Sequence, residues 1–165
     1  MKRVLLLILI TICTLSFEVY AQTVSYTYKP LAAEGCTMRY SVSRQNDSYY
    51  IIATVKSDRL LFLNEPTIKI RTFNGEVLTF SGKAIGNGSS SVGVISGNLV
   101  LPVSEISSTA QFKVTEEQFE QIKNGVAKIR ITMTPMNHER TFTKDKIGKK
   151  LYKFYIKQKE QEDSF

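Results

Sequence analysis

Residues 67–85 read TIKIRTFNGEVLTFSGKAI, and the pattern of this stretch predicts the fold class. Its first part alternates isoleucine with lysine or arginine. Successive side chains of a β-strand point to opposite faces, so a period of two predicts a strand with one buried and one solvated face. Asn74-Gly75 then separates two such segments, and both residues tolerate the positive φ of a tight hairpin turn. The stretch therefore predicts two antiparallel strands joined by a short turn.

The same alternation recurs along much of the chain. Residues 49–56 (YYIIATVK) and 127–133 (AKIRITM) each place apolar side chains on one face and polar ones on the other. Turn-forming residues separate such segments about every ten residues, which is typical of sandwiches and barrels. We therefore expect one mainly β domain, an antiparallel β-sandwich or a partly open barrel. Within it, residues 86–91 (GNGSSS) are expected to form a flexible loop.

One short helix is predicted between two of these strands, over residues 116–124. Thr115 is followed three residues later by Gln118, which is the spacing of a capping box. Phe119 and Ile122 supply the apolar face, and Gly125 stands where a helix commonly ends.

Residues 145–161 are predicted to form a C-terminal amphipathic helix that begins at Asp145. At 100° per residue, Ile147, Leu151, Phe154 and Tyr155 fall within one arc. An alternative is a strand with alternate aromatic residues turned inward. In the helix, lysines occupy the opposite arc, and four of them are the candidate binding residues: Lys149, Lys150, Lys153 and Lys157. They form either a contact for an anionic partner or a solvated face that keeps the protein soluble.

The segment FKVTEEQFEQIKNGVAKIRI, residues 112–131, resembles part of many small exported bacterial β-sandwich proteins of uncharacterised function. In those proteins a capped helical turn leads into a K-I-R-I-type strand. The resemblance covers about 20 residues. It implies a β-rich fold and export, and it carries no active-site residues.

Residues 1–21 have the pattern of a secretory signal peptide. Lys2 and Arg3 precede an almost unbroken aliphatic run, and Ala21 stands at the expected cleavage position. The mature chain, residues 22–165, is the size of one domain and has no further run apolar enough to cross a membrane. We expect export to the periplasm or beyond, in a Gram-negative bacterium. Cys36 is the one cysteine that would remain, so no internal disulfide is expected and a buried side chain is the more common outcome.

The sequence offers little for catalysis, metals or cofactors. His138 is the single histidine, which excludes a three-histidine zinc site, and its polar surroundings predict a surface position. Glu116 and Glu120 share a helical face, where carboxylates near a helix N-terminus are explained by the helix dipole. No glycine-rich motif continues into the Gly-Lys-Ser/Thr of a phosphate loop. We therefore expect no catalytic residue, no metal and no cofactor.

The formal net charge is +7, which favours anionic partners. Nucleic acid is not expected, because the protein is exported and its lysines are not interleaved with exposed aromatic residues. The sequence thus predicts a non-catalytic binding protein of the periplasm or cell envelope that contacts a protein or an anionic surface. The alternative is a periplasmic inhibitor or immunity protein that blocks an enzyme or toxin with the loop at residues 86–91.

Overall fold

A computed structural model of the protein describes residues 22–28, 36–58, 60–96 and 99–160, and for residues 92–96 and 99–103 it describes the backbone alone. The predicted signal peptide, residues 1–21, lies outside the described residues.

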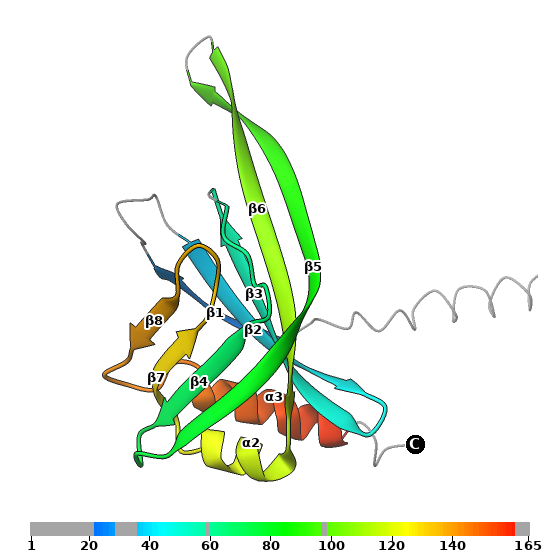
Figure 1. The fold of residues 1–165 in the computed structure, drawn as a ribbon, viewed down its shortest axis with the longest axis vertical. Helices are drawn as coiled ribbons and strands as arrows, with labels where there is room; N and C mark the ends of the chain where they lie inside the picture. The colour runs from blue at the N-terminus through cyan, green and yellow to red at the C-terminus, as the bar shows by residue number, and fades with distance from the viewer. Residues whose placement is uncertain (1–21, 29–35, 59, 97–98, 161–165) are drawn as a thin grey trace, which may run out of the picture.

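The described chain forms one antiparallel sheet that curls into a half-barrel (Figure 1). Its eight strands lie in the order β1-β2-β3-β6-β5-β4-β7-β8. In chain order the strands are β1 (Thr23–Tyr28), β2 (Cys36–Gln45), β3 (Ser48–Ser57), β4 (Thr67–Thr72), β5 (Val77–Ser96), β6 (Leu99–Val114), β7 (Val126–Ile131) and β8 (His138–Thr141). The expectation of a mainly β, partly open barrel is confirmed.

The hairpin predicted at Asn74-Gly75 joins β4 to β5. Gly75 has a φ of 94°, the left-handed region in which glycine is favoured. On its other side β4 pairs with β7, a strand that lies far along the chain. The pairing of β4 with β7 is therefore the contact that brings two distant segments side by side.

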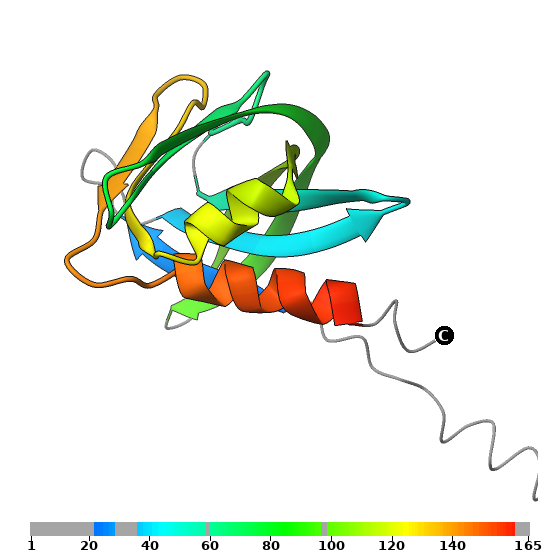
Figure 2. The ribbon, with the colours of Figure 1, turned by 90° about the horizontal axis from the view of Figure 1, so that it is seen from below.

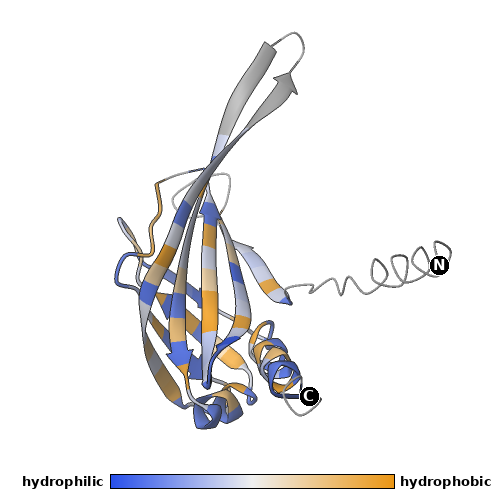
Figure 3. Ribbon diagram, turned by 90° about the vertical axis from the view of Figure 1, so that its right-hand side faces the viewer, coloured by the Kyte–Doolittle hydropathy of each residue, from blue (hydrophilic) through white to orange (hydrophobic). Residues whose placement is uncertain are grey.

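Apolar residues of the predicted alternation line the inner face of the curled sheet. The bands of apolar and polar residues alternate along the strands in Figure 3. The largest fully buried side chains of the sheet are Met38, Tyr40, Ile51, Ile68, Ile70, Phe112, Ile129 and Ile131. In β4, for example, alternate residues are buried, so the other face of the strand is available for contacts with solvent or with a ligand.

Helix α2 (Glu116–Ile122) follows the predicted capping pattern. The Gln118 backbone N–H donates to Thr115 Oγ1 at 3.3 Å, and the Thr115 backbone N–H donates to Gln118 Oε1 at 2.9 Å. Phe119 and Ile122 are buried, and Gly125 has a φ of 83°.

Helix α3 (Gly148–Glu160) lies beside α2 at one end of the sheet (Figures 1 and 2), so the predicted C-terminal helix is confirmed. Leu151 and Tyr155 are buried. The ring of Tyr155 stacks on that of Phe119 with centroids 4.5 Å apart and planes 4° apart, which joins the two helices. Asp145 caps α3 by accepting the backbone N–H groups of Gly148 and Lys149, both at 2.8 Å.

Residues 86–91 are not a loop, contrary to expectation. They lie within β5 and pair with residues 104–109 of β6, after a bulge between Ala84 and Gly86. Their side chains are small and exposed. Because these side chains do not pack into the core, small residues are tolerated here. The backbone stays extended because it pairs with β6.

His138 is not on the surface, contrary to expectation, and only 3% of it is exposed. It pairs in register with Ile131 and so takes the buried face of β8. Its Nε2 lies 2.8 Å from the Tyr26 hydroxyl of β1, which also lies 3.1 Å from the Tyr40 hydroxyl. Because β1 and β8 are the two outermost strands of the sheet, this contact links its two edges by side chains.

Candidate anion-binding face

Two neighbouring strands, β4 and β7, present four cations on the outer face of the sheet. Lys69 is directly opposite Arg130, and Arg71 is directly opposite Lys128. Like charges that face each other across a strand pair are destabilising. This arrangement has a cost to stability that a bound anion would remove.

The local sequence explains why these side chains point outward. In both strands the cations alternate with isoleucines that are at most 1% exposed: Ile68, Ile70, Ile129 and Ile131. Burial of those isoleucines is worth about 2 kcal/mol each, more than the repulsion of two solvated charges about 5 Å apart, which is about 1 kcal/mol. Burial of the isoleucines therefore determines the register of the two strands, and this register places the cations opposite one another.

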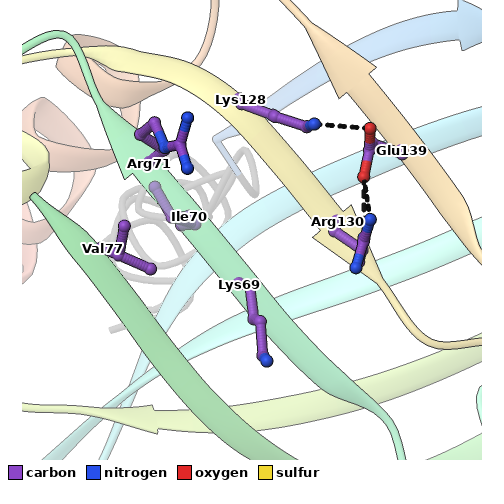
Figure 4. Close-up of a pocket in the computed structure, with 7 residues that line it drawn as sticks. All are labelled: Lys69, Ile70, Arg71, Val77, Lys128, Arg130 and Glu139. Carbon is purple, nitrogen blue, oxygen red and sulfur yellow. Dashed lines mark hydrogen bonds and ion pairs between the residues drawn. The ribbon is translucent and has the colours of Figure 1, made fainter. Parts of the chain in front are cut away.

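One carboxylate on β8, that of Glu139, bridges the two cations of β7 (Figure 4). Its Oε1 lies 2.6 Å from Lys128 Nζ, and its Oε2 lies 2.6 Å from Arg130 Nη2. Arg130 Nε donates to the same Oε2 at 2.7 Å. Hydrogen bonds from Lys128 and then Arg130 hold the pKa of Glu139 below its usual value. The carboxylate is ionised at neutral pH and forms ion pairs with both cations.

The two cations of β4 have no such partner. Neither Lys69 nor Arg71 forms an ion pair with any residue that the structure describes. A shallow pocket of about 170 Å³ lies among these residues, and Figure 4 shows its lining: Lys69, Ile70, Arg71, Val77, Lys128, Arg130 and Glu139. Four cations and one carboxylate thus line a pocket that is open to solvent.

The lysines predicted from the sequence lie elsewhere, on α3. Lys149, Lys150, Lys153 and Lys157 are all exposed. Within the described part of the chain none of the four forms an ion pair. Whether this lysine face binds a partner stays a prediction.

A hollow of about 390 Å³ adjoins the start of α3, and Ser25, Asp145, Lys146, Lys149 and Lys150 line it. The helix N-terminus there is already occupied by the Asp145 carboxylate. Burial would raise the pKa of Asp145, but the backbone N–H groups that donate to it hold the pKa below its usual value. This end of α3 already holds an anion of the protein itself.

The residues considered for catalysis have structural partners. Cys36 is buried, as expected, and its thiol donates to Ser57 Oγ at 3.1 Å. Lys159 lies 2.7 Å from Glu116, and Glu120 accepts the Tyr152 hydroxyl at 2.6 Å. Among the described residues no group of three or more potential ligands is placed to hold a metal ion. No helix in the described ranges is long and apolar enough to span a membrane.

Sequence reasoning missed the cations of β4 and β7 as a site, although a signal was present. Both strands carry Lys-x-Arg at positions of the solvated face, as Lys69/Arg71 and Lys128/Arg130. Each pair alone is ordinary for a half-exposed strand. The pattern of one strand cannot show which other strand lies beside it.

Comparisons with protein-family models, with curated proteins and with solved structures found no match.

Proposed function

We propose that this protein is an exported, non-catalytic binding protein of the bacterial periplasm or cell envelope, and that it contacts an anionic partner through the outer face of β4 and β7. The observation that carries the proposal is the direct opposition of like charges in two cross-strand pairs, with a single carboxylate beside them. The signal-like residues 1–21 support export.

The electrostatics of the face support binding. Two of its cations, Lys69 and Arg71, are exposed and have no ion-pair partner among the described residues. An anion placed between the strands would contact cations from both of them and would relieve their mutual repulsion. Such contacts strengthen in low salt and weaken as the ionic strength rises.

The lysine face of α3 is the second candidate surface. Its lysines are exposed, but they lie on one helix and point into solvent with no opposing strand of like charge. A helix face of this kind is explained by solubility alone. The β4–β7 face is therefore the stronger candidate, and the two can be separated by mutation.

The test measures binding to immobilised dextran sulfate, a generic polyanion, at low and high salt. One variant carries Lys69→Glu and Arg71→Glu, and the matched control carries Lys149→Glu and Lys153→Glu. Both variants lower the net charge by the same amount and change exposed side chains only. We expect the first to bind at least about tenfold more weakly than wild type, and the second less than about threefold, because localised charges act within about 10 Å.

The reverse order would make the α3 lysine face the contact surface. Equal, small losses in both variants, or absence of binding by wild type at low salt, would contradict the proposal. Circular dichroism and thermal melting of both variants would show that the fold is retained.

The inhibitor or immunity alternative can no longer rest on a loop at residues 86–91, because these residues are part of β5. It would now have to use the far part of the β5–β6 hairpin. There the two strands pair only with each other, past the residues that β3 and β4 contact. A stoichiometric complex with one enzyme that withstands high salt would favour this alternative.

A further inference from the structure

We infer that the partner of the β4–β7 face is an acidic polysaccharide, and that its anionic groups displace Glu139 from Lys128 and Arg130. The inference rests on the proposed function and goes further, because it names the class of ligand and a residue that opposes its binding.

The shape of the face favours a polymer over a small enclosed ligand. Pockets that bind small molecules are clefts of about 300–1,000 Å³ that bury most of the ligand. The pocket here is about 170 Å³ and is open. Neighbouring strands are about 4.8 Å apart and alternate residues of a strand about 7 Å apart, so the four cations are spread over an open area of the sheet's outer face. Such an open array of charges matches a chain with an anionic group on consecutive units.

The side chains around the cations favour a sugar over a protein. Hydroxyl residues stand opposite or beside them in the sheet: Thr79 is opposite Lys69, Thr141 is opposite Lys128, and Thr67 is opposite Ser81. Hydroxyls donate to and accept from sugar hydroxyls. Protein interfaces are instead enriched in aromatic residues at their centre. Among the described side chains, the large exposed apolar residues on or next to β4 and β5 are Val77, Ile85 and Phe73, and only Phe73 is aromatic.

Glu139 acts as a competitor built into the protein. A ligand anion that approaches Lys128 and Arg130 meets a carboxylate already bound to both, at 2.6 Å from each. Because this carboxylate is on the same chain, its effective concentration is high, and a single small anion such as sulfate cannot replace it. A polymer can, since its neighbouring groups are held on Lys69 and Arg71 at the same time. The face therefore discriminates by the number of linked charges.

The experiment measures dissociation constants by calorimetry with four probes: a sulfated hexasaccharide from heparin, an oligomer of galacturonate, a glutamate peptide of the same charge, and sodium sulfate. Wild type is compared with Glu139→Gln and with Glu105→Gln. Glu105 is a matched control, because it forms an ion pair with Lys56 at 2.6 Å on β3 and β6, and its replacement changes the net charge equally. Melting temperatures of both variants serve as the check on folding.

We expect wild type to bind the two saccharides and to bind the peptide at least about fivefold more weakly, because the peptide has no hydroxyls for the threonines around the cations. We expect no saturable binding of sulfate, because its charges are not linked along a chain. Glu139→Gln should bind the saccharides about fivefold to tenfold more tightly than wild type, because the competing charge-assisted contacts are gone. Glu105→Gln should differ from wild type by less than about twofold.

Three results would overturn the inference in different ways. Peptide binding as tight as saccharide binding would mean that the partner is an acidic protein. Unchanged or weaker binding by Glu139→Gln would mean that this carboxylate supports the site and does not compete, while the proposed function stands. Absence of binding to any polyanion would remove the proposed function itself.

Discussion

At the scale of single residues, the most informative side chain outside the cationic face is His138. A lone histidine among polar neighbours suggested a surface position, yet its ring lies against Tyr26 with centroids 5.6 Å apart and is almost fully buried. Burial, together with the positive charge of Arg140, lowers the pKa of His138 to about 4, and the negative charge of Glu139 acts in the opposite direction. The ring is therefore neutral at physiological pH.

This pKa predicts acid sensitivity with a defined sign. The folded pKa, about 4, is below the ordinary value of 6.5, so between these values the unfolded chain binds more protons. The contribution of His138 to stability is complete above pH 6.5 and is lost as the pH falls towards 4. We expect wild type to lose on the order of 2 kcal/mol more than His138→Gln between pH 7 and pH 4.5, measured by urea unfolding. Identical pH profiles for the two proteins would contradict the assignment.

At the scale of elements, the docking of α3 depends on Gly148, the first residue of the helix. A Cβ at this position would lie 2.7 Å from the Val126 backbone nitrogen and 2.8 Å from Gly125 Cα. Backbone atoms of another element cannot move aside as a flexible side chain can. The glycine, which is unfavourable for a helix, is thus required by the close approach of α3 to Gly125 and the first residue of β7.

Gly148→Ala should therefore destabilise the protein by about 1–3 kcal/mol, although alanine is favoured over glycine in helices by about 1 kcal/mol. Lys153→Ala, at an exposed position of α3, is the control and should change stability by less than about 0.5 kcal/mol. Chemical denaturation measures both. Greater stability of Gly148→Ala would show that the helix is not packed as closely as described.

At the scale of the whole molecule, the curled sheet has two edges, β1 and β8, and no ladder of backbone hydrogen bonds is described between them. Side chains cross the gap between these two edges, which we call the seam: the Tyr26 hydroxyl contacts His138 of β8. The Tyr26 ring also meets the ring of Phe142 edge-on, with centroids 5.4 Å apart. Burial raises the pKa of Tyr26 well above its ordinary value, so the hydroxyl keeps its proton. The half-barrel is closed here by side chains.

Tyr26→Phe should loosen this seam. It removes the hydroxyl contacts with His138 and Tyr40 while the ring remains, which should cost about 1–2 kcal/mol. The substitution should increase the hydrogen-exchange rate more in β8 than in β3, because β3 is paired on both sides. Tyr50→Phe, a half-buried tyrosine on β3, is the control. Equal protection of β8 in wild type and Tyr26→Phe would show that the seam is held by other contacts.

The sequence by itself determined the parts of the structure that depend on neighbouring residues. Period-two alternation predicted the strands, Asn74-Gly75 predicted the β4–β5 turn, and Thr115 with Gln118 predicted the start of α2. The apolar arc of Ile147, Leu151 and Tyr155 predicted that α3 is a helix with a buried face. Each of these signals is complete within one short helix or one hairpin.

Only the tertiary structure decided which strands are neighbours, and the candidate site depends on that. The pairs Lys69–Arg130 and Arg71–Lys128 arise because β4 lies beside β7, although β5, β6 and α2 separate the two strands along the chain. The burial of His138 has the same origin, since β1 lies across from β8. A strand's own pattern shows which of its faces is buried, but its neighbour is chosen by the packing of the whole core, and no short stretch of sequence contains that information.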